Sequence, residues 1–208
     1  MPGVSGAPPG RAGRNWLRRR LGTAERGRVQ LDRKLRVLFP EQQRLQLIAD
    51  RQRAAWSTAC AEARTWHLRT AVLNGQDGIR LSSPGERLTA EVTWTSTMGL
   101  RYPADIRLSH PDDTGLLHPD AASDRAAASF RAAVAAGARA AAADEALRRI
   151  DAEIAVTRRR LRALEKRWLP RLDEALRSLE LVLEQAEQED SMRLRQAATR
   201  GVEERRRS

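Results

Sequence analysis

The sequence predicts a mainly α-helical protein, in which two long helices pair as an antiparallel coiled coil and a small head with a short β-hairpin joins them. Its composition is one reason: 4% aromatic and 31% charged residues do not suit a thick globular core. The other is the stretch 153–170, EIAVTRRRLRALEKRWLP, whose apolar residues recur at three- and four-residue steps on one helical face. The rest of that helix is largely basic, so its apolar seam needs a partner helix.

The first predicted helix covers residues 15–74. A heptad-like series of apolar residues begins at Leu17 and continues to Leu73, as in a coiled coil. The preceding residues 1–14 are rich in glycine and proline, and we expect a flexible leader there.

Proline and glycine divide the N-terminal half of the chain. Pro40 lies inside the first predicted helix, where a proline removes one backbone hydrogen bond and clashes with the preceding turn. We therefore expect a bend near Phe39-Pro40. The Asn74-Gly75 pair is typical of a helix end, and we expect the helix to stop there.

The head is predicted to cover residues 75–124, because glycine and proline recur throughout this segment. Apolar and polar residues alternate over 88–95 and, more weakly, over 100–108, which is the pattern of two half-buried strands. Met98-Gly99 lies between them as a turn. Pro103 would restrict the second strand to a sheet edge.

The second predicted helix covers residues 125–200, and residues 201–208 form a basic tail. Pro119-Asp120 and Ser123 supply residues that favour a helix start. Beyond Trp168 the apolar seam advances in four-residue steps, which predicts a local unwinding of a left-handed coiled coil. Since the two helices are joined by a compact head, they should run antiparallel.

The net charge of +11 first suggests a nucleic-acid partner, but the charge is unevenly distributed. Residues 1–40 carry a net charge of +8 and residues 193–208 one of +4, whereas residues 75–124 carry −4. If the two ends lie side by side, the molecule has a basic tip and an acidic head. A basic coiled-coil adaptor that binds nucleic acid or an acidic protein is therefore an alternative. No aromatic–basic interleaving or docking motif supports nucleic-acid binding.

Motifs for catalysis or cofactor binding are missing from the sequence. It has no GxxxxGK[ST] loop and no GxGxxG after a strand, so we expect no bound nucleotide or other cofactor. The three histidines do not lie at metal-ligand spacing from each other or from Cys60, so no metal site is expected. His67 has a packing or solvated role, with a ligand or switch role as the alternative. No residue is assigned to catalysis, and a free-standing enzyme is the least favoured class.

The sequence also bears on location. No run of about 18 apolar residues is present, so we expect no transmembrane helix. No secretory-type apolar core follows the N-terminal arginines, and a single cysteine cannot form an internal disulfide. We expect a cytoplasmic protein.

The stretch 153–170 also carries a sequence motif. It resembles the EIxKTRRRVNALE motif, followed by proline, of the D subunit of vacuolar/archaeal-type rotary ATPases. Similar positions occur near the N-terminus, in the head and near the C-terminus: Leu17, Arg20-Leu21, Ala24, Gly27, Leu31, Lys34, Met98–Pro103, Glu184–Glu187 and Arg193–Arg195. The sequence departs from the family pattern at Val156, where lysine is usual, at Arg162, where asparagine is usual, and at Pro40.

This resemblance implies a central rotor stalk component of a proton-translocating ATPase or ATP synthase, peripheral to the plasma membrane. It implies that the paired helices enter a hexamer of catalytic A and non-catalytic B subunits, that the F subunit packs along the shaft, and that the head faces a membrane-side rotor socket. The candidate contacts are Arg18, Arg19, Arg20, Arg158, Arg159, Arg160, Arg193 and Arg195 for the hexamer, and Gly99 and Pro103 for the head.

Overall fold

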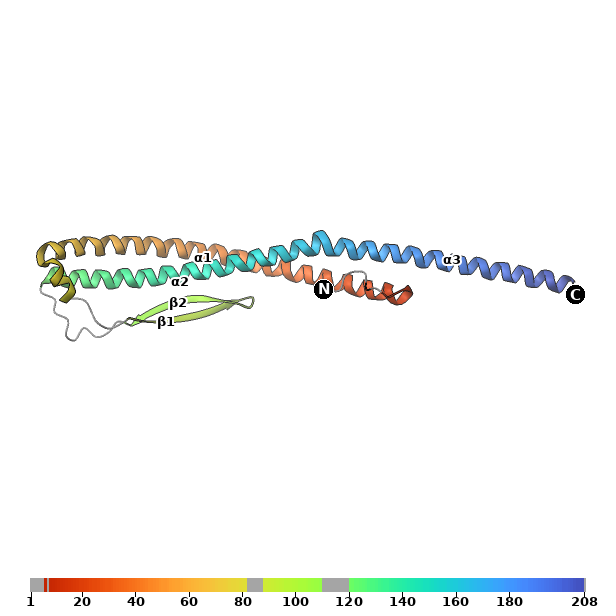
Figure 1. Ribbon diagram of the computed structural model, residues 1–208, viewed down its shortest axis with the longest axis horizontal. Coiled ribbons are helices and arrows are strands. Elements are labelled where there is room, and N and C mark those ends of the chain that lie inside the picture. The colour runs from red at the N-terminus through yellow and green to blue at the C-terminus, as the bar shows by residue number, and fades with distance from the viewer. Residues whose placement is uncertain (1–5, 7, 82–87, 110–119, 208) are drawn as a thin grey trace. The chain divides into compact units, whose positions relative to one another are not determined.

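The computed structural model of the protein describes residues 6, 8–81, 88–109 and 120–207, with the backbone alone at 76–81, 198, 199 and 201–207. The chain forms long helices and one β-hairpin (Figure 1). It divides into two compact units, one made of Met1–Arg33 with Thr157–Ser208 and the other of Lys34–Val156. Within the described residues, no helix is both long and apolar enough to cross a membrane.

Helix α1 spans Gly10–Leu81, so it starts earlier than predicted, and the last residues of the expected leader are helical. The remainder of the leader lies mostly outside the described residues. Gly75, with φ 65° and ψ −169°, interrupts the helical backbone at the predicted Asn74-Gly75 end. Glycine adopts this positive φ without steric cost, which explains why the helix breaks there.

Pro40 does not break α1. The helix continues through Pro40, and in the interior of α1 Gly75 is the residue that departs from helical dihedral angles. The Pro40 side chain is exposed, so neighbouring helices do not crowd its ring. The expected bend at Phe39-Pro40 therefore does not take the form of a helix break, and an axial bend there stays a prediction.

The predicted hairpin is confirmed. Strand β1, Thr89–Thr97, pairs antiparallel with β2, Leu100–Ser109. Met98 and Gly99 form the two-residue turn with φ values of 51° and 80°, as a type I′ hairpin turn requires. The pairing register shifts where Trp94 pairs with Pro103, which places the proline at an irregularity of a two-stranded sheet.

Helix α2, Ala121–Ala163, begins at the predicted capping sequence. The Asp120 carboxylate accepts a hydrogen bond from the Ser123 backbone N–H at 2.7 Å, as an N-cap residue does. Asn74 Nδ2 donates to Asp120 Oδ2 at 2.8 Å and to Ser123 Oγ at 3.0 Å. These bonds tie the C-terminal end of the first helical run to the start of the second.

In the Lys34–Val156 unit α1 and α2 run antiparallel (Figure 1). Two ion pairs show the direction. Lys34 pairs with Glu153 at 2.6 Å, and Arg53, later in α1, pairs with Asp144, earlier in α2, at 2.7 Å. Small side chains dominate the buried seam of α2 at alternating three- and four-residue steps. The buried residues at these steps are Ser123, Ala126, Ser129, Ala133, Ala136, Ala140, Ala143, Leu147, Ile150 and Ile154, and Ala146 is buried beside them.

The other unit pairs the first part of α1 with α3, Leu169–Arg207. Leu17, Leu172 and Leu176 form its buried cluster. Arg18 pairs with Glu180 at 2.6 Å and Arg11 with Glu187 at 2.8 Å, so this helix pair is antiparallel as well.

A π-helical turn, η2, separates α2 from α3. It covers Leu164–Trp168, and the Leu169 N–H donates to the Leu164 carbonyl five residues earlier. The apolar seam advances from Leu164 to Trp168, Leu172 and Leu176 in three steps of four residues. These steps span one residue more than an alternation of four, three and four residues would. A π-turn absorbs one extra residue, and Pro170 cannot donate the N–H that a continuous α-helix would use. A π-turn thus lies at the seam step near Trp168, and the local unwinding of the coiled coil stays a prediction.

Candidate functional site

The arginines at positions 18–20 have three different environments. Arg18 is used within the chain, in its ion pair with Glu180. The Arg20 guanidinium lies over the Trp16 ring at 4.6 Å from its centroid, in cation–π geometry. Arg19 is exposed, and within the described part of the chain its side chain has no ion-pair partner. Arg19 is thus the member of this group most available to a partner.

Arg193 and Arg195 are exposed on α3. Arg193 lies 3.8 Å from both Glu189 and Asp190 of its own helix, so these interactions do not link it to α1. Arg18 faces Glu180, which is 13 residues before Arg193, or roughly 20 Å along a helix. The structure therefore does not bring the predicted N-terminal and C-terminal arginines into one cluster.

Beyond its ion pairs with the start of α1, helix α3 continues as an exposed helix. Arg11 near the start of α1 lies opposite Glu187, and every residue from 184 to 197 is exposed. The predicted basic tip is therefore a single projecting helix that carries acidic residues before its arginines.

Arg158, Arg159 and Arg160 lie on the outer surface of α2, immediately after the buried Thr157. The heptad spacing explains this, because Thr157 occupies a seam position and the three positions after it turn away from the partner helix. Arg160 differs from the other two in lining a cavity that reaches to η2.

That cavity, which we name the tryptophan groove, has a volume of about 650 Å³ and lies within the unit that contains α3. Apolar side chains form its floor and arginines its rim. It is lined by Trp16, Arg19, Arg20, Thr23, Ala24, Leu31, Arg160, Ala163, Leu164, Trp168 and Leu172. Sequence reasoning identified Arg19, Arg20 and Arg160 as candidate contacts, but it did not identify the groove.

The hairpin packs along the helical pair in the Lys34–Val156 unit (Figure 1). Arg149 Nη1 donates to the Arg101 carbonyl at 3.1 Å, and both guanidinium groups lie within 5.0 Å of the Trp94 ring centroid. The turn at Gly99 thus lies beside the helices and away from the Asn74-Gly75 corner. Pro103 is buried, so of the two predicted head contacts only Gly99 is exposed.

Tyr102 joins the hairpin to α1. Its side chain is 2% exposed, and its hydroxyl donates to Glu41 Oε1 at 2.7 Å. Two nitrogens of Arg44 bind the same carboxylate at 2.5 and 2.9 Å. The Arg44 hydrogen bond is the main reason that the pKa of Glu41 lies below its usual range, whereas burial raises the pKa of Tyr102.

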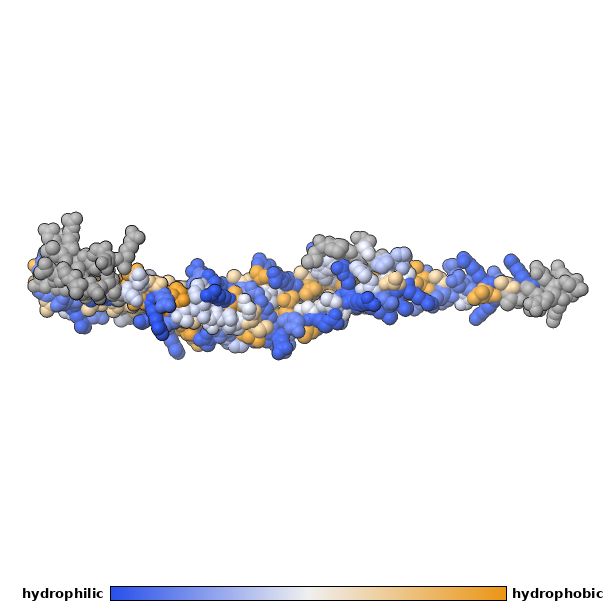
Figure 2. Space-filling model, turned by 90° about the horizontal axis from the view of Figure 1, so that it is seen from below, coloured by the Kyte–Doolittle hydropathy of each residue, from blue (hydrophilic) through white to orange (hydrophobic). Residues whose placement is uncertain are grey.

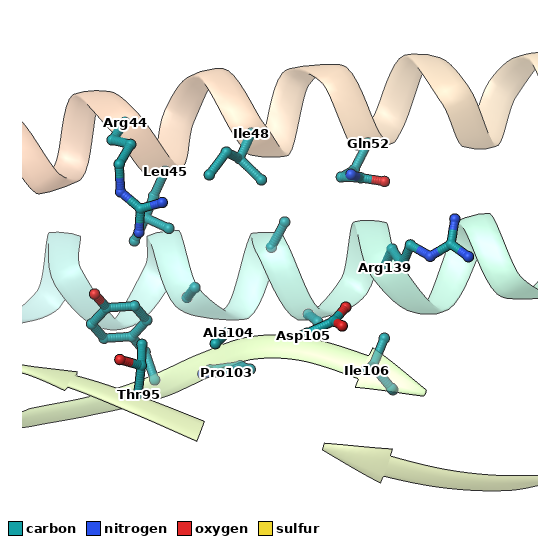
Figure 3. A pocket seen from close by; sticks show the side chains of 14 residues that line it. Arg44, Leu45, Ile48, Gln52, Thr95, Pro103, Ala104, Asp105, Ile106 and Arg139 are labelled. Atoms are coloured by element: carbon teal, nitrogen blue, oxygen red, sulfur yellow. The ribbon is translucent and has the colours of Figure 1, made fainter. Parts of the chain in front are cut away.

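A cavity of about 260 Å³ separates β2 from the helices in this unit. Figure 3 shows Arg44 of α1 and Arg139 of α2 on the helical side of this cavity, at opposite ends of the view, with Asp105 of β2 near the Arg139 end. Its lining combines two arginines, one carboxylate and apolar side chains with the polar residues Gln52, Thr95 and Tyr102, without a histidine or cysteine. This arrangement suits the packing of a hairpin on helices better than acid–base or nucleophilic chemistry.

His67 and Cys60 differ in environment. His67 makes an edge-to-face contact with Phe130, with ring centroids 5.8 Å apart, which favours its packing role. Cys60 is exposed. Over the described ranges, no group of three histidine, cysteine or acidic residues lies close enough to bind a metal ion.

Sequence reasoning also missed Tyr102 and its partners. Tyr102 is the single tyrosine of the chain, and a tyrosine on a strand often needs a hydrogen-bond partner when buried. That signal could have marked it as a contact residue, although the partner, 61 residues away in the chain, is set by the fold.

A comparison with protein-family models matches residues 15–199 to the family of ATP synthase D subunits. The comparison with curated proteins found no significant match. The family match covers most of the chain, including both helical runs, the hairpin and the π-turn. It agrees with the paired helices and with the resemblance of residues 153–170. The chain belongs to the D-subunit family of V/A-type ATP synthases.

Proposed function

We propose that this chain is the central rotor shaft of a V/A-type proton-translocating ATPase or ATP synthase. The family is a stalk component of the rotary ATPases, and it is generally non-catalytic. We further propose that the chain turns within the hexamer of catalytic A and non-catalytic B subunits and couples ion-driven rotation to ATP synthesis or hydrolysis. The match over residues 15–199 carries this proposal.

The helix pairs have the physical properties that transmission of torque requires. Antiparallel helices with buried seams resist twisting when ion pairs join them across the seam, as Arg18–Glu180 and Lys34–Glu153 do. Each exposed ion pair contributes only about 0.5 kcal/mol to stability, so the buried seam supplies most of the stiffness. Exposed arginines such as Arg19 and Arg159 are in a position to face the hexamer.

The proposed partners are the A and B subunits, the F subunit and a membrane-side rotor socket, with the complex peripheral to the plasma membrane. At the Asn74-Gly75 corner, Val72 is 85% exposed and Leu73 is 65% exposed. Apolar side chains exposed at a helix end favour contact with another protein. We therefore assign the socket contact to this corner and place Gly99 at a contact along the side of the shaft.

Surface hydropathy bears on the kind of contact that the chain makes. Figure 2 shows hydrophilic side chains over much of the visible face, with separate hydrophobic patches between them. Such a surface fits a shaft that makes many small and changing contacts better than one that makes a single permanent contact.

Substitution of Arg158, Arg159 and Arg160 together by alanine tests the hexamer contact. The three side chains project from α2, so the helix pair should remain folded. We expect coupled ATPase activity to fall about tenfold or more, with nucleotide affinity of the A and B subunits unchanged, because a lost interface of about 1.4 kcal/mol corresponds to a factor of ten. Arg148→Ala, an exposed arginine elsewhere on α2, is the matched control.

The proposal itself is tested by purification of the complex. A single copy of this chain should co-purify with three A and three B subunits, as the family resemblance implies. Absence from the purified complex would disprove the shaft assignment. Duplex binding that weakens steeply with salt would instead favour the nucleic-acid adaptor.

A further inference from the structure

The tryptophan groove has features of a binding site. Its floor contains Leu164 and Trp168, two of the π-turn's own residues, so the shape of the groove depends on the extra residue in the seam. Single π-turns inside α-helices occur frequently at functional sites. Leu172 is buried in the neighbouring core, whereas Trp16 and Trp168 remain half-buried and present apolar surface to the groove.

The charge at the groove has a single sign. Three of the lining residues, Arg19, Arg20 and Arg160, are cationic, and no acidic residue lines the groove. Arg20 is occupied with Trp16, but within the described part of the chain neither Arg19 nor Arg160 has an ion-pair partner. Elsewhere in this unit Arg18 and Arg28 do pair with Glu180 and Glu165. Unpaired arginines around an apolar floor complement an acidic, amphipathic ligand.

We propose that the tryptophan groove binds an acidic amphipathic helix of a neighbouring protein in the complex. An apolar side chain of that helix enters between Trp16 and Trp168, and its carboxylates pair with Arg19 and Arg160. The groove volume of about 650 Å³ accommodates one or two large side chains, and a helix provides such anchors at successive turns on one face. This inference rests on the proposed function, because it requires the chain to be one component of a larger complex.

The test measures binding of a probe peptide to the full chain in isolation. The probe is a labelled, capped helical peptide of about 20 residues, with leucine along one face and glutamate on the others. We expect saturable binding in fluorescence anisotropy, weakening as salt is raised. A matched peptide with lysine in place of every glutamate should not bind. Equal binding of both peptides, or binding of neither, overturns the proposal.

Charge reversal then locates the site. The double variant Arg19→Glu with Arg160→Glu should weaken peptide binding at least tenfold. Arg177→Glu makes the same kind of change on an exposed arginine of this unit that does not line the groove, and it should bind as the unaltered chain does. Trp168→Ala should weaken binding by a similar factor, with circular dichroism confirming that the helices remain. Unchanged affinity in the Arg19/Arg160 variant overturns the assignment.

Two outcomes separate this inference from the shaft proposal. If the chain co-purifies with A and B subunits but does not bind the acidic peptide, the groove assignment fails and the shaft stands. If it binds the peptide and is absent from the complex, the shaft assignment fails. Concentration-dependent self-association that the Arg160→Glu change abolishes would identify a second copy as the occupant and overturn the proposed partner.

Discussion

Among single residues, Tyr102 and Glu41 connect the hairpin to the helical pair. The tyrosine hydroxyl donates to Glu41 at 2.7 Å and lies 3.0 Å from the Thr97 hydroxyl. Arg44 Nη2 donates to the same oxygen, Glu41 Oε1, and Arg44 Nε donates to Oε2. The phenol is therefore a buried polar group with its hydrogen bonds satisfied, and its ring contributes apolar burial as well.

Substitution of Tyr102 by phenylalanine removes the hydroxyl but keeps the ring. We expect the free energy of unfolding to fall by about 1.5 kcal/mol, because a hydrogen bond to a charged group is lost. Urea denaturation measures the change. Thr97→Val, which leaves the bond to Glu41 intact, should cost less, about 0.5–1 kcal/mol. Equal stability of the phenylalanine variant and the unaltered chain would show that Glu41 does not fix the hairpin.

The same residue predicts a loss of stability at alkaline pH. Burial and the Glu41 carboxylate raise the pKa of Tyr102 in the folded protein, whereas in the unfolded chain it titrates near 10. Below that pH the neutral phenol is present in both states and its contribution is complete. As pH rises from about 10 toward the folded pKa, only the unfolded chain releases the proton, so the free energy of unfolding falls.

Tyrosinate absorbance measures this titration directly, because the chain has one tyrosine. The midpoint should lie above 10, and Glu41→Gln should lower it without returning it fully, since burial remains the larger cause. A midpoint at or below 10 in the folded chain would contradict the buried, Glu41-bonded phenol. Tyr102→Phe supplies the control without a tyrosinate signal.

At the scale of the helices, Gly137 lies inside α2 although glycine destabilises a helix interior, and its contact with Trp56 of α1 explains why. A Cβ atom added there would lie 2.9 Å from Trp56 Nε1, so the glycine provides the space in which the indole packs. Trp56 is nevertheless 47% exposed, because the rest of its ring faces solvent over an alanine-rich seam. The part of the indole that is not exposed therefore packs against α2 at Gly137.

Gly137→Ala and Gly22→Ala form a matched pair that tests this packing. Alanine is favoured over glycine inside a helix by about 1 kcal/mol, and at Gly22 the nearest atom, Arg26 Nη1, is 3.8 Å from the new Cβ. Gly22→Ala should therefore raise the free energy of unfolding by about 1 kcal/mol. Gly137→Ala should give no gain or a loss, with a red shift in tryptophan fluorescence as Trp56 is displaced. A full gain at Gly137 would refute the contact.

For the molecule as a whole, the exposed end of α3 is expected to contribute to assembly of the complex and not to the stability of the fold. No residue from 184 to 197 is buried, so this stretch adds little to the stability of the described helix pair. Truncation after Gln188 should change the free energy of unfolding by no more than about 0.5 kcal/mol. The truncated chain should lose its place in the ATPase complex in a co-purification assay if the projecting helix enters the hexamer. A large loss of stability would show that this end packs on its own chain.

Local sequence signals predicted the fold class, the hairpin turn at Met98-Gly99, the helix start near Asp120 and the break in the first helix at Asn74-Gly75. Each depends on interactions among residues that are neighbours in the chain, such as the positive φ that glycine tolerates or a capping bond within one turn. Pro40 predicted a bend near Phe39-Pro40; the structure keeps α1 helical through this exposed proline, and an axial bend there stays a prediction.

By itself, the sequence determined that two amphipathic helices pair around a hairpin, because apolar periodicity and turn residues are read from neighbouring positions. Only the tertiary structure decided that Arg18 faces Glu180, that Tyr102 reaches Glu41, and that the extra seam residue becomes a π-turn beside a groove. The physical reason is the same in each case: these contacts depend on the axial register between helices, and many small packing terms summed along the whole seam set that register.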